Sequence, residues 1–235
     1  AYTAGVADPR TKRPSLDRSS PLPERAPEVM RLLKEEYPDA KVALRFEDPL
    51  QCLIAVILSA QSTDVKVNEV TEPLFRKYRT AEDWLRAPEA RLLQELKPTG
   101  FFNQKTKAVR GACRMIVEEF GGRVPDSMAE LIRLPGVARK TANIVLWSSY
   151  PERARGDPDI GIAVDTHVRR VSQRLGFTEQ QDPTKIERDL METVPKDEWY
   201  GFTYVLIDHG RALCKAPTPK CELCPVNHLC PASLV

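Results

Sequence analysis

Apolar residues recur at helical spacing along most of the chain. Between residues 29 and 37 they stand at i, i+3, i+4 and i+8, and Pro38 ends the segment. The segment 50–60 is apolar on nearly every side. It follows Asp48 and Pro49, which are typical of a helix N-cap and first helical position. We expect this segment to be the buried centre of a helical domain.

The same periodicity predicts a series of further helices. They span residues 65–78, 80–86, 88–96, 104–120, 127–133, 142–147, 166–175, 184–194 and 198–211. No alternating run of convincing length predicts a strand, and we find no internal repeat. The stretch 150–159 is polar and contains two prolines and a glycine, so we expect it to separate two lobes. The sequence therefore predicts an all-α protein with two helical lobes.

Composition narrows the class of protein. The chain has 235 residues, of which 42% are hydrophobic and 29% charged, which is enough for a core and excludes disorder, collagen or coiled coil for the whole chain. The longest apolar run is far shorter than the ~20 residues of a membrane span. Residues 1–27 are rich in proline and basic residues, without the apolar stretch of a signal peptide. We expect a flexible basic arm there and an intracellular protein.

The charges are balanced overall and uneven locally. Thirty-five Lys and Arg face 33 Asp and Glu, and a net charge of +2 does not itself indicate a nucleic-acid partner. Residues 91–123, however, hold seven basic residues against three acidic ones. This surplus predicts a basic face, of the kind that binds a polyanion in a salt-sensitive and largely sequence-independent way.

The cysteines fall into two groups. Cys52 and Cys113 stand alone in apolar helical patterns and are expected to be small buried hydrophobes. The other four lie within 17 residues, as Cys214-x6-Cys221-x2-Cys224-x5-Cys230. Nothing marks the chain as secreted, so disulfides explain them poorly, and four thiolates on one loop favour a metal centre. Zinc and an iron–sulfur cluster both fit such a donor set, and the 6-2-5 spacing favours the cluster.

A tight turn between two helices can bind phosphate. Pro135 and Gly136 reverse the chain, and the next helix begins with exposed backbone N–H groups, which suit an anion. An ordinary corner between helices has the same outline. Basic residues at 133, 139 and 140, with no acid between residues 131 and 147, favour the phosphate site.

Two residues near this turn have the chemistry of a reaction centre. Lys140 lies in the first turn of its helix, where the helix dipole disfavours a cation, and partial burial would free its amine as a nucleophile. The alternative is a solvated surface lysine. Asp165 ends an apolar run where a helix begins, so it is a helix N-cap that can also face a reaction centre.

These elements occur in the order found in a known family. With the residues LSAQSTD at 58–64, the hairpin, the Val-Asp-Thr-His run and the cysteine loop resemble the endonuclease III family of bifunctional DNA glycosylases and lyases. The resemblance covers roughly residues 28–230. It implies a six-helix barrel with a helix–hairpin–helix over residues 43–153. It also implies a [4Fe–4S] cluster lobe built from 28–42 plus 154–235, with DNA in the cleft between the lobes.

The resemblance also implies individual roles. Lys140 would attack C1′ of a nucleotide carrying an oxidised pyrimidine, and Asp165 would stabilise the developing positive charge. Cys214, Cys221, Cys224 and Cys230 would hold the cluster. The residues implied to contact DNA are Gln61 and Phe101 as wedges, Gly136, Ala138 and Arg139 in the hairpin, and Lys215 and Lys220 in the cysteine loop.

Some features depart from the family pattern. Ala138 stands where the family usually has a glycine, and the stretch 150–159 is longer than usual. A non-enzymatic helix–hairpin–helix DNA-binding protein and a monofunctional glycosylase are the alternative functions. The expected partner is double-stranded DNA with damaged bases or abasic sites, bound by a monomer. The expected location is the cytoplasm at the nucleoid, or the nucleus or mitochondrion in a eukaryote.

Overall fold

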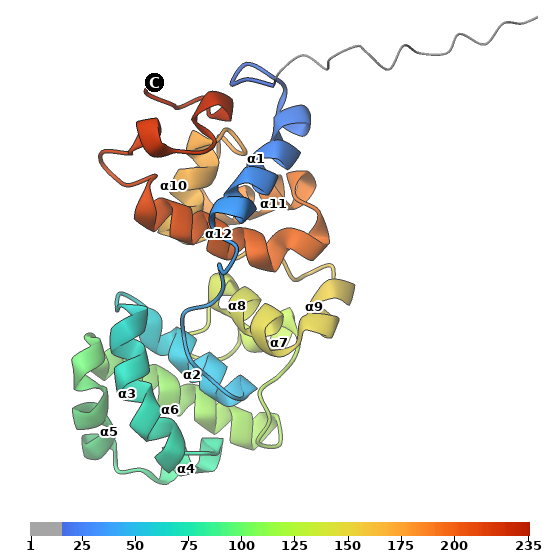
Figure 1. The fold of residues 1–235 in the computed structure, drawn as a ribbon. Helices are drawn as coiled ribbons and strands as arrows, with labels where there is room; N and C mark the ends of the chain where they lie inside the picture. The colour runs from blue at the N-terminus through green and yellow to red at the C-terminus, as the bar shows by residue number, and fades with distance from the viewer. Residues whose placement is uncertain (1–15) are drawn as a thin grey trace, which may run out of the picture.

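The computed structural model of the protein describes residues 16–235, and most of the predicted basic arm lies outside the described residues. Every regular element in the described part is a helix, which confirms the all-α prediction. The helices form two lobes, one above the other in Figure 1. None of the helices in residues 16–235 is long and apolar enough to cross a membrane.

The lower lobe in Figure 1 is built around its first helix, which is labelled α2. Its elements are α2 (Pro49–Ser59), α3 (Asp64–Lys77), α4 (Ala81–Arg86), α5 (Glu89–Leu96), the 3-10 turn η1 (Lys97–Thr99), α6 (Phe102–Glu119), α7 (Met128–Leu131) and α8 (Arg139–Ser149). Seven consecutive residues of α2, Cys52 to Leu58, are buried, and α3, α6 and α8 pack around it. Asp48 caps α2 by accepting a hydrogen bond from the N–H of Gln51. The apolar segment is therefore the centre of its lobe, as predicted.

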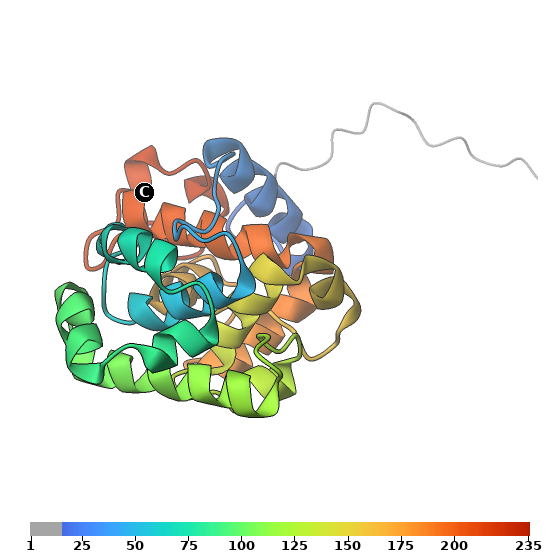
Figure 2. The ribbon, with the colours of Figure 1, turned by 90° about the horizontal axis from the view of Figure 1, so that it is seen from below.

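The upper lobe joins the two ends of the described chain. It contains α1 (Leu22–Glu36), α10 (Thr166–Arg174), α11 (Pro183–Thr193), α12 (Trp199–Ala212) and the short turns η2 (Lys196–Glu198), η3 (Cys221–Leu223) and η4 (Asn227–Leu229). α12 packs against both α1 and α10. Figures 1 and 2 both show the blue α1 beside the orange and red C-terminal helices.

The first helix begins earlier than the sequence suggested. α1 starts at Leu22, so the expected arm of residues 1–27 ends too late. Arg25 is only 4% exposed and donates hydrogen bonds to the carbonyls of Leu175, Gly176 and Leu229. These bonds anchor the first turn to the C-terminal part of the chain. The helix tolerates its internal Pro27 because such tertiary contacts outweigh one missing backbone hydrogen bond.

The polar stretch between the lobes is partly helical. A short helix, α9 (Pro151–Gly156), occupies the segment predicted to be an irregular break. Pro151 suits its first turn and Ala154 is fully buried, which explains how a polar segment becomes ordered. The helix expected from Ala142 begins at Arg139, because Ala138 already serves as its N-cap. The chain then crosses to the upper lobe through residues 157–165, which end at Asp165 (Figure 1).

Candidate active site

A cavity of about 250 Å³ lies where the two lobes meet. Lys140 lines it from α8 of the lower lobe, and Asp165 lines it from the start of α10 in the upper lobe. Further lining residues come from the loop after α2 and from α12. The fold thus brings a lysine and a carboxylate, 25 residues apart in the chain, into one cavity between the lobes.

The turn before Lys140 requires a glycine at position 136. Gly136 has a φ of +81°, and a Cβ atom there would lie 2.7 Å from Cβ of Ala108. Ala138 follows as the N-cap of α8, in extended conformation, and no side chain caps this helix. The N–H groups of its first turn therefore lack a side-chain acceptor, which leaves them able to bind an anion.

Lys140 is exposed and lines this cavity. Burial therefore does not add to the reactivity of its amine. Its place in the first turn of α8, where the helix dipole opposes a positive charge, still favours the neutral form of the amine. The neighbouring Arg139 is only partly exposed.

Asp165 combines two functions at one carboxylate. Its Oδ1 accepts hydrogen bonds from the backbone N–H groups of His167 and Val168, both at 2.8 Å. This confirms the predicted N-cap. Within residues 16–235, no hydrogen bond reaches its other oxygen, and the residue lines the cavity. Helix capping thus fixes the position of the carboxylate through Oδ1, and Oδ2 accepts no hydrogen bond within residues 16–235.

His167 makes its side-chain contacts within the upper lobe. Burial lowers its pKa, against the opposing effect of the Asp165 carboxylate, so the ring is neutral at neutral pH. Its Nδ1 lies 3.2 Å from Nη2 of Arg170, which also donates to the carbonyl of Gly210. The ring therefore contributes to the packing of α10 on α12, and it also lines the cavity.

The two predicted wedge residues share an unusual backbone conformation. Gln61 has a φ of +52° and Phe101 a φ of +48°, and they are the two non-glycine residues with positive φ within residues 16–235. Such conformations are costly for side chains with a Cβ and gather at functional sites. Phe101 is 58% exposed, while Phe102 packs against the core. The contact of Gln61 and Phe101 with DNA stays a prediction.

The four clustered cysteines line one small cavity at the end of the upper lobe. All four are free thiols. Burial raises the pKa of Cys224 to about 11, and the neighbouring cysteines of the loop add to this rise. No three His, Cys, Asp or Glu side chains in the described part of the chain stand close enough for a single metal ion. Lys215 and Lys220 of the same loop are exposed.

The comparisons with known proteins agree with this geometry. Residues 54–196 match the family model described as "HhH-GPD superfamily base excision DNA repair protein". Proteins called endonuclease III are 48% identical in a Synechocystis species, covering 89% of this chain and 93% of the relative, and 44% identical in Bacillus subtilis, covering 83% and 86%. The chain belongs to the endonuclease III family. Its fold matches a solved non-covalent endonuclease III–DNA complex with a TM-score of 0.83 and 40% identity, covering 90% and 96% of the two chains.

A second solved structure shows how far the endonuclease III architecture extends. A thermostable thymine-DNA glycosylase matches with a TM-score of 0.77 and 25% identity, covering 89% of this chain and 96% of that one. The endonuclease III relatives at 48% and 44% identity confirm the predicted family.

A larger groove of about 670 Å³ lies on the lower lobe beside α2 and α3, and it contains neither Lys140 nor Asp165.

Four charged residues that line the cavity were not predicted from the sequence as site residues: Lys41, Asp64, Asp208 and Arg211. Asp64 of α3 forms an ion pair with Arg211 of α12 at 3.0 Å, which joins the two lobes, and Asp208 lies one turn before Arg211. Tyr204 also lines the cavity and precedes Asp208 by four positions. The spacing at 204, 208 and 211 places these side chains on one face of α12, and this helical spacing was the available signal.

Some of the basic residues in the segment 91–123 are not free to form an exposed basic face. Lys105 is only 4% exposed, and its Nζ donates to the carbonyl of Thr99 at 2.7 Å. Arg91 pairs with Glu95. Lys105 therefore stabilises the loop that carries Phe101, so this charge is not part of an exposed basic face.

The pKa of Asp208 yields a prediction about stability. Burial raises this pKa, Arg211 opposes the rise and Asp64 adds to it. Because the carboxyl is harder to ionise when folded, its contribution to stability is present in acid and is lost as the pH rises through the folded pKa. We expect Asp208→Asn to remove this loss, so that the variant gains stability relative to the wild type as the pH rises above 3.8, the ordinary pKa of an aspartate. Urea unfolding at a series of pH values measures the difference.

The matched control for this prediction is Asp39→Asn, which alters an exposed carboxylate that does not line the cavity. Its stability difference from the wild type should not grow with pH. A difference for Asp208→Asn that stays constant or shrinks as the pH rises would contradict the assigned environment.

Proposed function

We propose that this chain is a base-excision DNA glycosylase and abasic-site lyase that removes oxidised pyrimidines from double-stranded DNA. The observation that carries the proposal is the meeting of Lys140 and Asp165 in one cavity between the lobes. A flipped-out nucleotide that enters such a cavity would present its C1′ to both groups.

The amine of Lys140 supplies the nucleophile. Its Nζ forms a bond to C1′ while the bond from C1′ to the base breaks, and the base leaves with the electron pair and gains a proton. Opening of the sugar ring then gives a Schiff base between Lys140 and C1′. The imine acidifies the C2′ proton. Loss of this proton expels the 3′ phosphate oxygen and cuts the strand.

Asp165 supplies a fixed negative charge. Positive charge develops at C1′ as the bond to the base breaks, and a carboxylate already held in place stabilises it without reorganisation. The hydrogen bonds from His167 and Val168 to Oδ1 provide this rigidity. A carboxylate held in this way can also accept the proton that Lys140 loses.

The DNA contacts follow from the surfaces beside the cavity. The uncapped start of α8, after Gly136 and Ala138, suits a backbone phosphate. Gln61 and Phe101 suit the space that a flipped nucleotide leaves in the duplex. Lys215 and Lys220 extend the phosphate contacts from the cysteine loop. The chain would act as a monomer in the cytoplasm, at the nucleoid.

The cysteine loop fits a [4Fe–4S] cluster. Its donor set is four free thiols around one cavity, which is the ligand set such clusters take. Buried thiolates repel one another, so a positively charged metal centre is the natural counterpart for Cys214, Cys221, Cys224 and Cys230. When bound, the cluster would tie the loop into a rigid unit. Its expected role is structural, positioning Lys215 and Lys220.

Covalent trapping tests the nucleophile. We expect borohydride to reduce the Schiff base and give a covalent complex with duplex DNA that contains an abasic site. Lys140→Ala should lose this complex and at least about 10³-fold of its strand cutting, because no other amine takes its place. Denaturing gel electrophoresis measures both quantities. Lys185→Ala alters a lysine that does not line the cavity and should leave trapping unchanged.

The same assay separates the alternative functions. A complex that survives in Lys140→Ala would reject the assigned nucleophile. Base release without cutting would indicate a monofunctional glycosylase, and binding without either reaction would indicate a DNA-binding protein. A panel of duplexes with defined lesions, scored for base release, tests the preference for oxidised pyrimidines.

Replacing the carboxylate separates charge from structure. Asparagine caps helices as well as aspartate does, so Asp165→Asn should fold and bind DNA normally. We expect base release to fall by about 10²- to 10⁴-fold, because the charge that stabilises C1′ is lost. Single-turnover kinetics measure the rate, and urea unfolding checks the fold. An unfolded variant, or one with full activity, would reduce Asp165 to a helix cap.

Absorbance identifies the metal centre. The purified protein should be brown, with a broad band near ~400 nm and four irons per chain. Cys221→Ser should lose the band, while Cys113→Ser should keep it, because Cys113 is fully buried in the other lobe. A colourless protein that contains zinc would overturn the cluster.

A further inference from the structure

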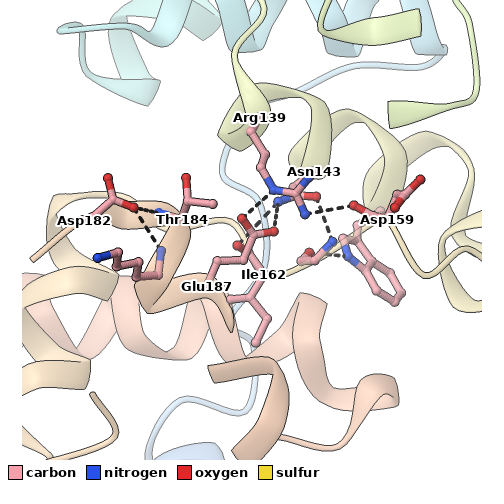
Figure 3. A network of polar contacts seen from close by, with 10 residues as sticks. Arg139, Asn143, Asp159, Ile162, Asp182, Thr184 and Glu187 are labelled. Atoms are coloured by element: carbon pink, nitrogen blue, oxygen red, sulfur yellow. Dashed lines mark hydrogen bonds and ion pairs between the residues drawn. The ribbon is translucent and has the colours of Figure 1, made fainter. Parts of the chain in front are cut away.

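A buried carboxylate of the upper lobe holds the helix that carries Lys140. Glu187 lies on α11, and its side chain is 5% exposed. Its Oε2 accepts a hydrogen bond from Nε of Arg139 at 2.7 Å, and its Oε1 accepts one from Nδ2 of Asn143 at 2.8 Å. Arg139 and Asn143 are one turn apart on α8. Figure 3 shows both side chains directed at the carboxylate.

The same network reaches the segment that leads to Asp165. Asn143 is completely buried, and its Oδ1 accepts a hydrogen bond from the N–H of Gly161 at 2.9 Å. Nη2 of Arg139 donates to the carbonyl of Asp159, also at 2.9 Å (Figure 3). Nε1 of Trp147 donates to the carbonyl of Gly161. Residues 159–161 are thereby bound to α8 by side chains spaced along that helix.

Lys140 and Asp165 stand at the two ends of this network. Lys140 directly follows Arg139, and Asp165 lies four residues after Gly161. A shift of Glu187 relative to α8 would therefore change the distance between the amine and the carboxylate. Asp182 fixes the start of α11 by accepting hydrogen bonds from Thr184 and Lys185, so Glu187 projects from an anchored helix (Figure 3).

We propose that Glu187 is a positioning residue for the glycosylase and lyase reactions, and that Arg139 serves this contact rather than a DNA phosphate. The inference rests on the proposed function. A buried carboxylate that loses its cationic partner is strongly disfavoured, so Arg139 cannot leave Glu187 for DNA without a large cost. The backbone of the hairpin remains free to bind phosphate.

A substitution at Gly161 offers a second, independent way to disturb the same network. A Cβ atom at Gly161 would lie 2.0 Å from Oε1 of Glu187 and 2.8 Å from Sδ of Met191. Gly161→Ala therefore displaces the carboxylate without removing any hydrogen-bonding group. If Glu187 positions the site, Gly161→Ala should reproduce the effect of Glu187→Gln.

The test compares chemistry with binding. Glu187→Gln and Gly161→Ala should lower the single-turnover rate of base release at saturating enzyme by about 10- to 100-fold, the range expected for small misplacements of reacting groups. Affinity for a duplex with a tetrahydrofuran abasic analogue should stay within about threefold. Amide hydrogen exchange should rise in residues 139–143 and 159–165, which reports the positions of these segments without relying on activity. Glu152→Gln, which alters an exposed carboxylate paired with Arg155, is the matched control and should change neither quantity.

Salt dependence distinguishes the two roles of Arg139. As a phosphate ligand, its replacement by glutamine would reduce the slope of log Kd against log salt by about 0.9. If Arg139 is instead the partner of Glu187, Arg139→Gln should leave the slope unchanged and lower the single-turnover rate at saturating enzyme. The double variant Arg139→Gln with Glu187→Gln should then be no slower than the slower single variant, because both act through one contact.

The outcomes separate this inference from the function beneath it. If the unsubstituted protein neither releases bases nor forms the trapped complex, the proposed function fails. If it does both, the positioning role is overturned by a reduced salt slope in Arg139→Gln. It is equally overturned by full saturated rates in Glu187→Gln and Gly161→Ala.

Discussion

The contact between α8 and α11 determines whether this molecule has an active site. The two lobes share one continuous apolar cluster, yet the cavity exists only where the lobes meet, and Lys140 and Asp165 come from opposite sides of it. The contact of α8 with α11 is polar, because Glu187 receives hydrogen bonds from Arg139 and Asn143. Polar contacts require particular angles and distances, whereas apolar surfaces can slide. The boundary therefore has one defined geometry.

The lower lobe supplies the rigid support that this geometry requires. α2 is buried along most of its length, and α8 packs directly on it. On its other side, α8 presents Arg139 and Asn143 to Glu187 of the upper lobe, and Trp147 to the ring of Trp199. One helix thus links an apolar core to a hydrogen-bonded boundary, and its first turn carries Lys140. Movement of Lys140 would have to disturb either the apolar core of the lower lobe or the hydrogen-bonded contact with the upper lobe.

Much of this arrangement could be read from local patterns. Helical periodicity predicted the helices, the Asp-Pro pair predicted the start of α2, and Asp165 was identified as a cap. Patterns spread along the chain could not reveal partners brought together by folding. The role of Glu187 depends on α8, 44 residues away in the chain, and its sequence surroundings look like an ordinary solvated helix. Lys105 and Arg25 were misjudged for the same reason, since their burial depends on carbonyl groups from other segments.

The left-handed backbone at Gln61 and Phe101 has a thermodynamic consequence. A loop that adopts its working shape only on meeting DNA loses conformational entropy at that moment, which weakens binding. Here the loops that carry the two residues already hold them in an unfavourable conformation, and Lys105 stabilises the loop of Phe101. The free energy that this conformation requires is therefore supplied during folding, before the protein meets DNA. The predicted contact of Gln61 and Phe101 with a duplex would then require no further change of backbone conformation at these two residues.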